Sequence, residues 1–337
     1  MSFLAFAVRR IALTVLVLFG VTLITFFLTH VVPVNPVLAL VGDHAPQSVV
    51  RQAEHEFGLD QPLPVQYVLY IRGLLHGNLG ISIADQRPVS VDLAQYLPAT
   101  IELSTAAIVV AVVVGMVTGI ISALFVNRVP DQLARVFALL GVSLPVFFTA
   151  LVFLGIFYVK LGWLPGPGQL GPYTEPPPHI TGMVVVDALL SGDWQALGDA
   201  LSHLFLPAVI LGWSSAGIIA RMTRSSLLEV LRLDYIRAAY AKGLRKPRVV
   251  LRHALPNAMI PVITVIGLAY GSLLQGAVLT ETIFSWPGIG RYATYSVINI
   301  DVPAVMGVTL LAAVIYSLVN LIVDLLYARL DPRITYS

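Results

Sequence analysis

The chain contains no cysteine, so it can form neither a disulfide framework nor a thiolate metal site. Charged residues are also scarce: they make up 11% of the 337 residues, whereas 57% are hydrophobic. A soluble domain carries roughly 25% charged residues, and a water-facing surface cannot be built from so few. We therefore expect lipid to be the solvent for much of this surface.

The motifs of several enzyme classes are missing as well. No glycine-rich phosphate loop ends in Gly-Lys-Ser/Thr, so we do not expect the chain to bind and hydrolyse ATP itself. No His-Glu-x-x-His or Gly-x-Ser-x-Gly pattern occurs, and the seven histidines are scattered, whereas metal ligands cluster. His203 and His253 lie at the edges of apolar runs, where a structural role is the default. We expect no catalytic residue, no metal and no cofactor on this chain.

The sequence does contain long apolar runs. A spanning helix needs roughly 20 mainly apolar residues, and six runs qualify: 11–29, 101–126, 133–159, 204–220, 258–280 and 304–327. Arg9 and Arg10, followed by the first apolar run, resemble the start of a signal peptide. This run is about 19 residues long, beyond the roughly 7–15 of a signal core, and no small-residue cleavage site follows it. The fourth run is the shortest and contains Pro207.

Lysine and arginine divide unequally between the two sides of this six-span arrangement. Fifteen of the 20 lie on one side, which includes the long loop 221–257. The five on the other side are Arg51, Arg72, Arg87, Lys160 and Arg291. Because cytoplasmic segments of membrane proteins are enriched in Lys and Arg, we expect both termini and this loop to be cytoplasmic. Glu102 and Asp324 approach the spans only near their ends, so a proton relay inside the membrane is poorly supported.

Two long loops are predicted to lie on the outer side. The first, 30–100, shows helical apolar periodicity over 47–57 and again over 63–75, which predicts two short amphipathic helices. The other, 160–203, is rich in glycine and proline over 162–178. That composition favours extended and turn conformations over helix.

The basic inner loop, 221–257, carries its own pattern. Residues 227–242 have good helix formers with apolar residues at helical spacing. Gly243 suits the left-handed position just after a helix, Pro247 suits the first turn of a second helix, and Pro256 is expected to end that helix. The loop should therefore be a helix, a glycine turn and another helix.

The small side chains of Ala238 and Ala239 would let another protein approach this loop closely. An alternative is an amphipathic helix that lies on anionic lipid and is held there by its arginines. The residues alone leave both interpretations open.

The same loop carries a spaced motif. Arg237, Ala238 and Ala239, then three residues and Gly243, then nine residues and His253-Ala254-Leu255-Pro256, resemble the EAA loop of ABC-transporter permeases. The family pattern has Glu-Ala-Ala, three residues, Gly, nine residues and Ile-x-Leu-Pro. Arg237 therefore replaces the Glu, and His253 replaces the Ile.

The resemblance extends over essentially the whole chain and is weakest over 166–199. Residues 221–230, 257–267 and 280–291 are similar to the membrane subunits of dipeptide, oligopeptide and nickel importers, and 76–82 resembles a further family stretch. The chain is identified as a member of that permease family, of the dipeptide permease B type.

This resemblance implies an all-α membrane protein with the six-helix fold of type I ABC importer permeases, in the inner membrane of a bacterium. It implies a first part, 1–100, with one span and an outer loop, and a five-helix core, 101–337. It also implies partners: a second homologous permease, two cytoplasmic ATPase subunits that use ATP and Mg²⁺, and an extracytoplasmic substrate-binding protein. No nucleic acid is expected.

In the family the EAA loop docks into the ATPase and couples ATP hydrolysis to the pore. The resemblance assigns this coupling role to nine positions here: Tyr235, Arg237, Ala238, Ala239, Lys242, Gly243, His253, Leu255 and Pro256. An Arg at 237 would pair with an acid on the ATPase, or it would face solvent and matter little. We expect the alanine surface and the Gly243 turn to matter more.

The segment 280–291 follows the fifth predicted span on the outer side. It holds a tight apolar turn that we expect to contact the binding protein at the pore mouth, formed by Phe284, Trp286, Pro287, Gly288 and Gly290. The alternative is an aromatic anchor at the membrane interface. Two glycines and a proline are more than such an anchor needs.

Other functions are less well supported. A secondary transporter would need inverted repeats or charges near the midplane, and a membrane enzyme would need clustered polar side chains in the spans. An exporter would usually lack the EAA loop. We expect peptides as the substrate, with nickel complexes, glutathione or another small solute as alternatives. Scattered polar span residues would suit a water-lined path: Ser143, Thr264, Ser272 and Asn320.

Overall fold

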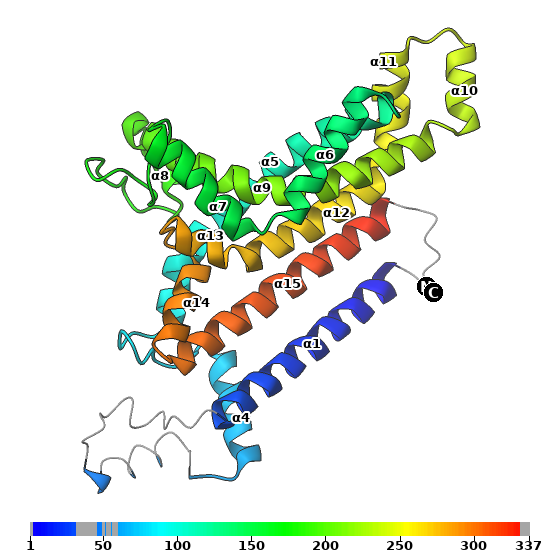
Figure 1. Ribbon diagram of the computed structural model, residues 1–337. Helices are drawn as coiled ribbons and strands as arrows, with labels where there is room; N and C mark the ends of the chain where they lie inside the picture. The colour runs from blue at the N-terminus through cyan, green and yellow to red at the C-terminus, as the bar shows by residue number, and fades with distance from the viewer. Residues whose placement is uncertain (1–2, 32–45, 49–50, 52–54, 56–59, 331–337) are drawn as a thin grey trace.

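The computed structural model describes residues 3–31, 46–48, 51, 55 and 60–330, which form a single elongated bundle of helices (Figure 1). In this described part no strand forms, and Ile81 and Pro88 make one isolated antiparallel bridge. The predicted all-helical class is confirmed.

Four predicted spans are confirmed as long apolar helices. They are α1 (Phe3–Val31), α5 (Val89–Leu124), α12 (Leu255–Gly276) and α15 (Val302–Leu330). Each is long and apolar enough to cross a membrane, α12 together with the helical turns that precede it. The proposed division at residue 100 falls inside α5, which runs on without a break.

The third predicted span is not one straight helix. It consists of α6 (Val129–Ser143) followed by α7 (Val146–Phe153) and the π-helical η1 (Leu154–Lys160), and the two halves meet at 104°. Leu144 at the break has an extended backbone, with φ −82° and ψ 131°. Pro145 follows it, and a proline ring disfavours helical geometry in the residue before it. The sequence therefore contained the cause of the bend.

The fourth predicted span, 204–220, was too short. Helix α9 (Trp194–Val230) has 37 residues and takes in part of each flanking loop. Asp193 caps its start by accepting a hydrogen bond of 2.9 Å from the backbone N–H of Ala196. Pro207 is buried inside the helix and does not end it.

Small residues let α9 approach both of its neighbours. On one side lie Gly115 and Gly119 of α5, where a Cβ on Gly119 would come 2.7 Å from the carbonyl oxygen of Ala220. On the other side a Cβ on Gly217 would collide with the carbonyl oxygen of Ala138 in α6. Without such side chains the helix backbones pack directly, as is common between membrane helices. Helix α9 is therefore the centre of the bundle.

Helix α1 lies at the edge of the bundle against α15, and most of its apolar side chains are exposed. Arg10 of α1 lies 3.1 Å from the carboxylate of Asp324 in α15. The start of α1 and the end of α15 are therefore at the same end of the molecule, where α10 and α11 also project (Figure 1). We call this the basic end.

The opposite end holds the remaining short elements. Helix α4 (Leu63–Leu75) confirms the second helix predicted in the first loop. The first, over 47–57, lies largely outside the described residues. Residues 161–183 form no helix, as their glycine and proline content predicted, and α8 (Val184–Ser191), which was not predicted, follows them.

Candidate functional site

The basic inner loop forms two short helices that project at the basic end of the bundle, α10 (Asp234–Ala241) and α11 (Lys246–Val249) (Figure 1). Gly243 between them has φ +79°, so the predicted left-handed turn is confirmed. The predicted helix over 227–242 is interrupted, because α9 ends at Val230 and α10 begins only at Asp234. This break lets α10 turn away from the axis of α9.

The predicted end at Pro256 is wrong. Helix α11 passes through the π-helical η2 (Val250–Ala254) into α12, and Lys246–Gln275 is continuous enough to count as one span. Pro256 lies in the first turn of α12. A π-helical turn shifts the hydrogen-bond pattern by one residue, which accommodates the missing N–H of a proline. Pro247 lies in the first turn of α11, as predicted.

Ala238 and Ala239 do not form one surface. Ala239 is only 9% exposed and belongs to a buried cluster that includes Ile236, Leu227 and Val249. Ala238, the neighbouring residue, is exposed. The expectation that both alanines present a docking surface is therefore wrong for Ala239, because one face of a two-turn helix must cover the apolar ends of its neighbours.

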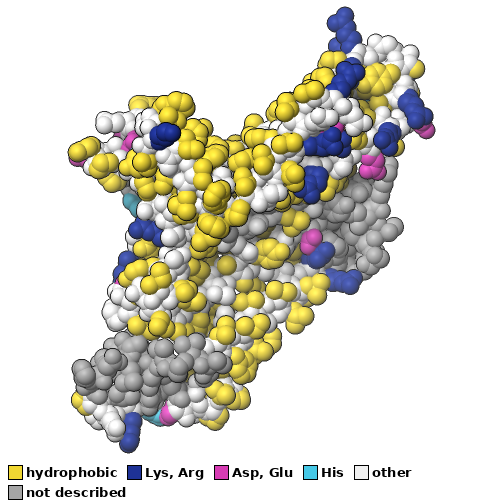
Figure 2. All heavy atoms as spheres, in the orientation of Figure 1, with side chains coloured by type: hydrophobic (Ala, Val, Ile, Leu, Met, Phe, Trp, Pro, Cys, Tyr) yellow, Lys and Arg dark blue, Asp and Glu magenta, His cyan; other side chains and the backbone are white. Residues whose placement is uncertain are grey.

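The outward face of α10 is polar and open. Arg237 is 74% exposed and lies 3.3 Å from Asp234 one turn earlier, which is a surface ion pair of small energetic weight. Lys242 and Tyr235 are exposed as well. Figure 2 shows lysine and arginine side chains gathered around this end of the molecule.

The second half of the motif lies closer to the bundle. His253 and Leu255 are half-buried and Pro256 is exposed. The backbone oxygen of His253 accepts a hydrogen bond of 2.8 Å from the Asn257 side chain and a long one of 3.5 Å from the Tyr235 hydroxyl. The hydrogen bond from Tyr235 thus joins α10 to η2, just before α12 begins.

At the opposite end, the turn after α13 (Val278–Ile283) is built into the core. Trp286 is 1% exposed, and its indole N–H donates a 2.8 Å hydrogen bond to the carbonyl oxygen of Ala99 in α5. Phe284 is also buried, in a cluster with Ile210 and Leu206 of α9. The alternative of an interface anchor is therefore wrong, because that role needs an aromatic ring at the membrane surface.

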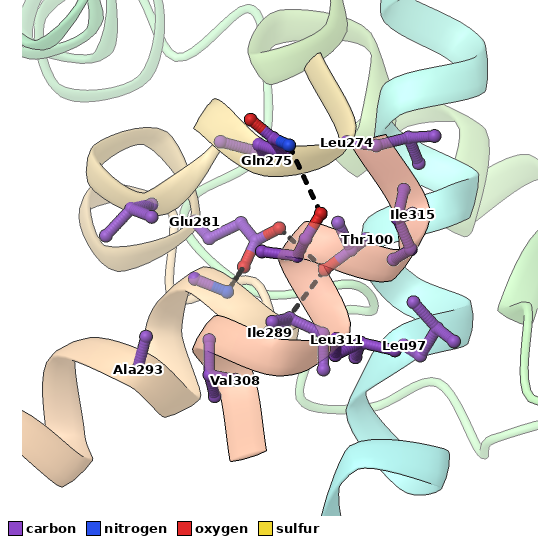
Figure 3. Close-up of a pocket in the computed structure, with 14 residues that line it drawn as sticks. Leu97, Thr100, Leu274, Gln275, Glu281, Ile289, Ala293, Val308, Leu311 and Ile315 are labelled. Carbon is purple, nitrogen blue, oxygen red and sulfur yellow. Dashed lines mark hydrogen bonds between the residues drawn. The ribbon is translucent and has the colours of Figure 1, made fainter. Parts of the chain in front are cut away.

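Glu281 organises this turn, although no sequence motif marks it as a functional residue. Its carboxylate accepts hydrogen bonds from the Thr100 hydroxyl at 2.8 Å and from the backbone N–H of Gly290 at 2.7 Å (Figure 3). It also accepts one from the backbone N–H of Arg291 at 3.1 Å. The last two donors belong to the first turn of α14 (Ile289–Ile298), where a negative charge is favourable. Burial raises the pKa of Glu281, and the hydrogen bonds oppose that rise.

The glycines of the turn are there for space. A Cβ on Gly288 would collide with the Glu281 carboxylate, and one on Gly290 would collide with the backbone of Val278. Gly288 and Gly290 are buried and Pro287 is half-buried. The turn therefore holds α13 and α14 on α5, and the predicted contact with a binding protein at these positions stays a prediction.

The acid predicted near a span end, Glu102, also makes structural contacts. It is buried and accepts a 2.7 Å hydrogen bond from the backbone N–H of Val185 at the start of α8. Gln169 donates to its other oxygen at 3.4 Å. Glu102 thus fixes α8 and the preceding loop to α5. Among the described residues no group of three or more acidic, histidine or cysteine side chains could hold a metal.

A pocket at this end is lined mainly by apolar residues of α5, α12, α14 and α15, with Glu281 and Thr100 at one wall (Figure 3). Gln275 closes part of it by donating a 3.2 Å hydrogen bond to the carbonyl oxygen of Ala312. Both oxygens of Glu281 already have protein donors. The Glu281 carboxylate at the pocket wall is thus already engaged by donors of the protein itself.

Comparison with known families agrees with the motif. Residues 115–336 match the model of the binding-protein-dependent transport system inner membrane component, and residues 3–104 match the model of the N-terminal part of such membrane components. The two models together cover most of the chain.

Similar proteins include the probable D,D-dipeptide transport system permease protein DdpB of Escherichia coli K12, 47% identical over 95% of this chain and 94% of the relative. The dipeptide transport system permease protein DppB of Alkalihalophilus pseudofirmus is 46% identical over 99% of this chain and all of the relative. The glutathione transport system permease protein GsiC of Escherichia coli O6:H1 is 37% identical over 99% of each.

These matches run through the loop with the EAA-like motif, the bent third span and the buried outer turn alike. The chain therefore belongs to the family of binding-protein-dependent transport system inner membrane components, as a membrane-spanning permease subunit of an ABC importer.

Proposed function

We propose that this permease imports small peptides, above all dipeptides, as one half of a pore whose other half is a second, homologous permease. The names of the two relatives at 46–47% identity both include dipeptide transport. Glutathione, which the 37% relative is named for, is itself a small peptide. A peptide is thus the substrate class that these relatives share, and nickel complexes remain an alternative.

The observation that carries the proposal is the projecting pair α10 and α11. Two cytoplasmic ATPases, which use ATP and Mg²⁺, would each dock on such an element of one permease, and a substrate-binding protein would deliver peptide at the opposite end. The basic end and both termini would then face the cytoplasm, in line with the excess of Lys and Arg there. This chain itself would carry no catalytic residue and bind no cofactor.

The docking face would be the exposed side of α10. Ala238 is small enough for close approach, and Arg237 and Lys242 beside it offer positive charge to an acidic groove. The Gly243 turn would set the angle between this face and α11. The half-buried residues His253 and Leu255 would transmit its position to α12.

The test is uptake by the complete importer, with its second permease and two ATPases, reconstituted in liposomes with the binding protein added outside. We expect ATP inside the vesicles to drive uptake of a labelled L,L- or D,D-dipeptide. Glutathione and a nickel complex serve as competing substrates. If nickel alone were accumulated, the peptide assignment would be wrong.

The same vesicles prepared without the ATPase subunits are the control for a stand-alone transporter. ATP-independent uptake at the full rate in those vesicles would contradict the proposal of an ATP-driven importer.

A further inference from the structure

A buried carboxylate joins three helices at the basic end. Asp131 in the first turn of α6 is 0% exposed, and the hydroxyl of Ser122 in α5 donates a short hydrogen bond to it. The backbone N–H of Asn127 donates to its second oxygen at 2.8 Å. From α9, Arg224 donates through Nε at 3.2 Å and through Nη2 at 3.3 Å.

Arg135 also reaches Asp131, at 3.2 Å, but it lies on the same helix four residues away and its side chain is 52% exposed. The side chain of Arg224 is 26% exposed and comes from a different helix. Both arginines thus pair with the same carboxylate, Arg135 from within α6 and Arg224 from α9. Of the two arginines, only Arg224 reaches Asp131 from α9, where the indole N–H of Trp213 also donates a 3.1 Å hydrogen bond to the carbonyl oxygen of Phe137 in α6.

On α9, Arg224 lies close to the residues that pack against the α10–α11 loop. One turn beyond Arg224, Leu227 is fully buried in the same cluster as Ile236 of α10 and Val249 of α11. Ala123, next to Ser122 in α5, belongs to that cluster too. A displacement of α10 and α11 would therefore act on the last turns of α9 directly.

On the other helix, Asp131 lies at the start of the bent span. Asp131 begins α6, which runs to the break at Leu144 and Pro145, beyond which α7 continues at 104°. Gly217 of α9 and Ala138 of α6 are in direct contact along the way. Two helices held both by close packing and by a buried ion pair move together, whereas packing alone allows them to slide.

We propose that the Asp131–Arg224 pair is the positioning contact that passes movement of the α10–α11 loop to α6 and α7. This inference rests on the proposed function as an ATP-driven permease. Neither residue would touch substrate or ATP. Their contribution would be to keep α6 in register with α9, so that the ATPase cycle reaches the bent span.

The test compares Arg224→Gln with Arg135→Gln in the reconstituted importer, and measures peptide taken up per ATP hydrolysed. Each variant removes one positive charge beside Asp131, but only Arg224→Gln cuts the link between helices. We expect Arg224→Gln to lower uptake per ATP roughly tenfold, within the usual range of coupling effects, while ATP hydrolysis and copurification of the ATPases change less than about twofold. Arg135→Gln should stay within about twofold of wild type for all three.

Equal uptake per ATP in the two variants would overturn the inference. So would a parallel loss of uptake, hydrolysis and copurification in Arg224→Gln, because that pattern describes a merely structural pair. If Arg224→Gln does not accumulate in the membrane, Arg224→Lys replaces it: Lys keeps the charge but loses the two-point geometry. We expect an intermediate loss of uptake per ATP from Arg224→Lys, and full coupling would count against the inference.

Wild-type vesicles separate this inference from the proposed function. If wild type shows no ATP-driven peptide uptake, the proposed function fails. If wild type is active and Arg224→Gln is equally active, only the inference fails.

Discussion

The two ends of this bundle treat their motif residues in opposite ways. At the basic end, α10 projects from the bundle and keeps Tyr235, Arg237 and Ala238 exposed. At the opposite end, the turn with Trp286 and Gly288 is packed against α5. There the Trp286 indole donates a hydrogen bond to the Ala99 carbonyl oxygen, and Glu281 accepts hydrogen bonds from Thr100 and from the backbone of Gly290. The first arrangement leaves a surface for a partner, whereas the second holds helices in place.

A sequence motif is therefore not in itself evidence of an interface in this protein. Both segments attract attention in the sequence, because each combines glycine, proline and aromatic residues. The two segments differ in burial. An exposed motif is free to contact another protein, whereas the side chains of a buried motif are constrained by packing within the chain. Substitutions in the buried turn should therefore affect stability, whereas substitutions on the exposed face of α10 should affect partner binding.

The largest effect should come from Trp286→Ala. It removes a fully buried indole and leaves a cavity against α5 and the Ala99 carbonyl oxygen. We expect a loss of about 3–5 kcal/mol in stability, measured as thermal unfolding of the purified protein in detergent. Trp163→Ala is the matched control, since Trp163 is 71% exposed. A similar loss of stability in both variants would show that burial of Trp286 in the turn does not stabilise the protein.

The two alanines of α10 should separate stability from docking. Ala239→Leu inserts a large side chain into the cluster of Leu227, Ile236 and Val249, and we expect it to cost about 1–3 kcal/mol. Ala238→Leu should leave the unfolding temperature unchanged but reduce copurification of the ATPase subunits. Unchanged copurification with Ala238→Leu would mean that docking uses another face of the loop.

Gly243 and Gly192 form a natural pair for testing the turn. Both have a left-handed backbone, with φ +79° and +72°, and neither has an atom within 4 Å of a built Cβ. Valine at either position should cost about 1–2 kcal/mol of local strain. Gly243→Val should in addition abolish coupled uptake while the protein stays in the membrane, and Gly192→Val should not. Normal uptake by Gly243→Val would rule out the turn as a coupling element.

The smallest effect concerns Glu281 and pH. Because burial raises its folded-state pKa above the usual 4.5, the folded protein holds this proton more tightly than the unfolded chain does. Its contribution to stability should therefore be greatest below pH 4.5 and should fall as pH rises toward the folded-state pKa. Glu281→Gln, which does not titrate, should lack this part of the pH dependence.

Unfolding of wild type and Glu281→Gln at a series of pH values checks this expectation. Between pH 4.5 and the folded-state pKa of Glu281, we expect the unfolding free energy of wild type to fall relative to that of Glu281→Gln by about 1 kcal/mol per pH unit. A difference that is constant with pH would mean that Glu281 has the same pKa in both states.

Much of the architecture could be predicted because composition and periodicity are local. The apolar runs predicted α1, α5, α12 and α15, and the backbone preferences of Gly243 and Pro247 predicted the turn and the start of α11. The break before Pro145 was also a local property, although it was not predicted.

Other features depended on which helices meet. Helical spacing places Ala239 on the same face as Ile236, but only the contacts with Leu227 and Val249 make that face a buried one and leave Ala238 exposed. Glu281 gains its role from Thr100 of α5 and the first turn of α14, and Asp131 gains its role from Arg224, 93 residues away.

Hydrophobicity and backbone sterics act locally, so the amino-acid order is enough to specify a helical membrane protein, the bias of its basic residues to one side and the conformation of its turns. Which motif residues are buried, and which charges are paired, depends instead on the packing of the helices. Burial and ion pairing are properties of contacts between segments far apart in the chain, and each such contact needs both partners in place.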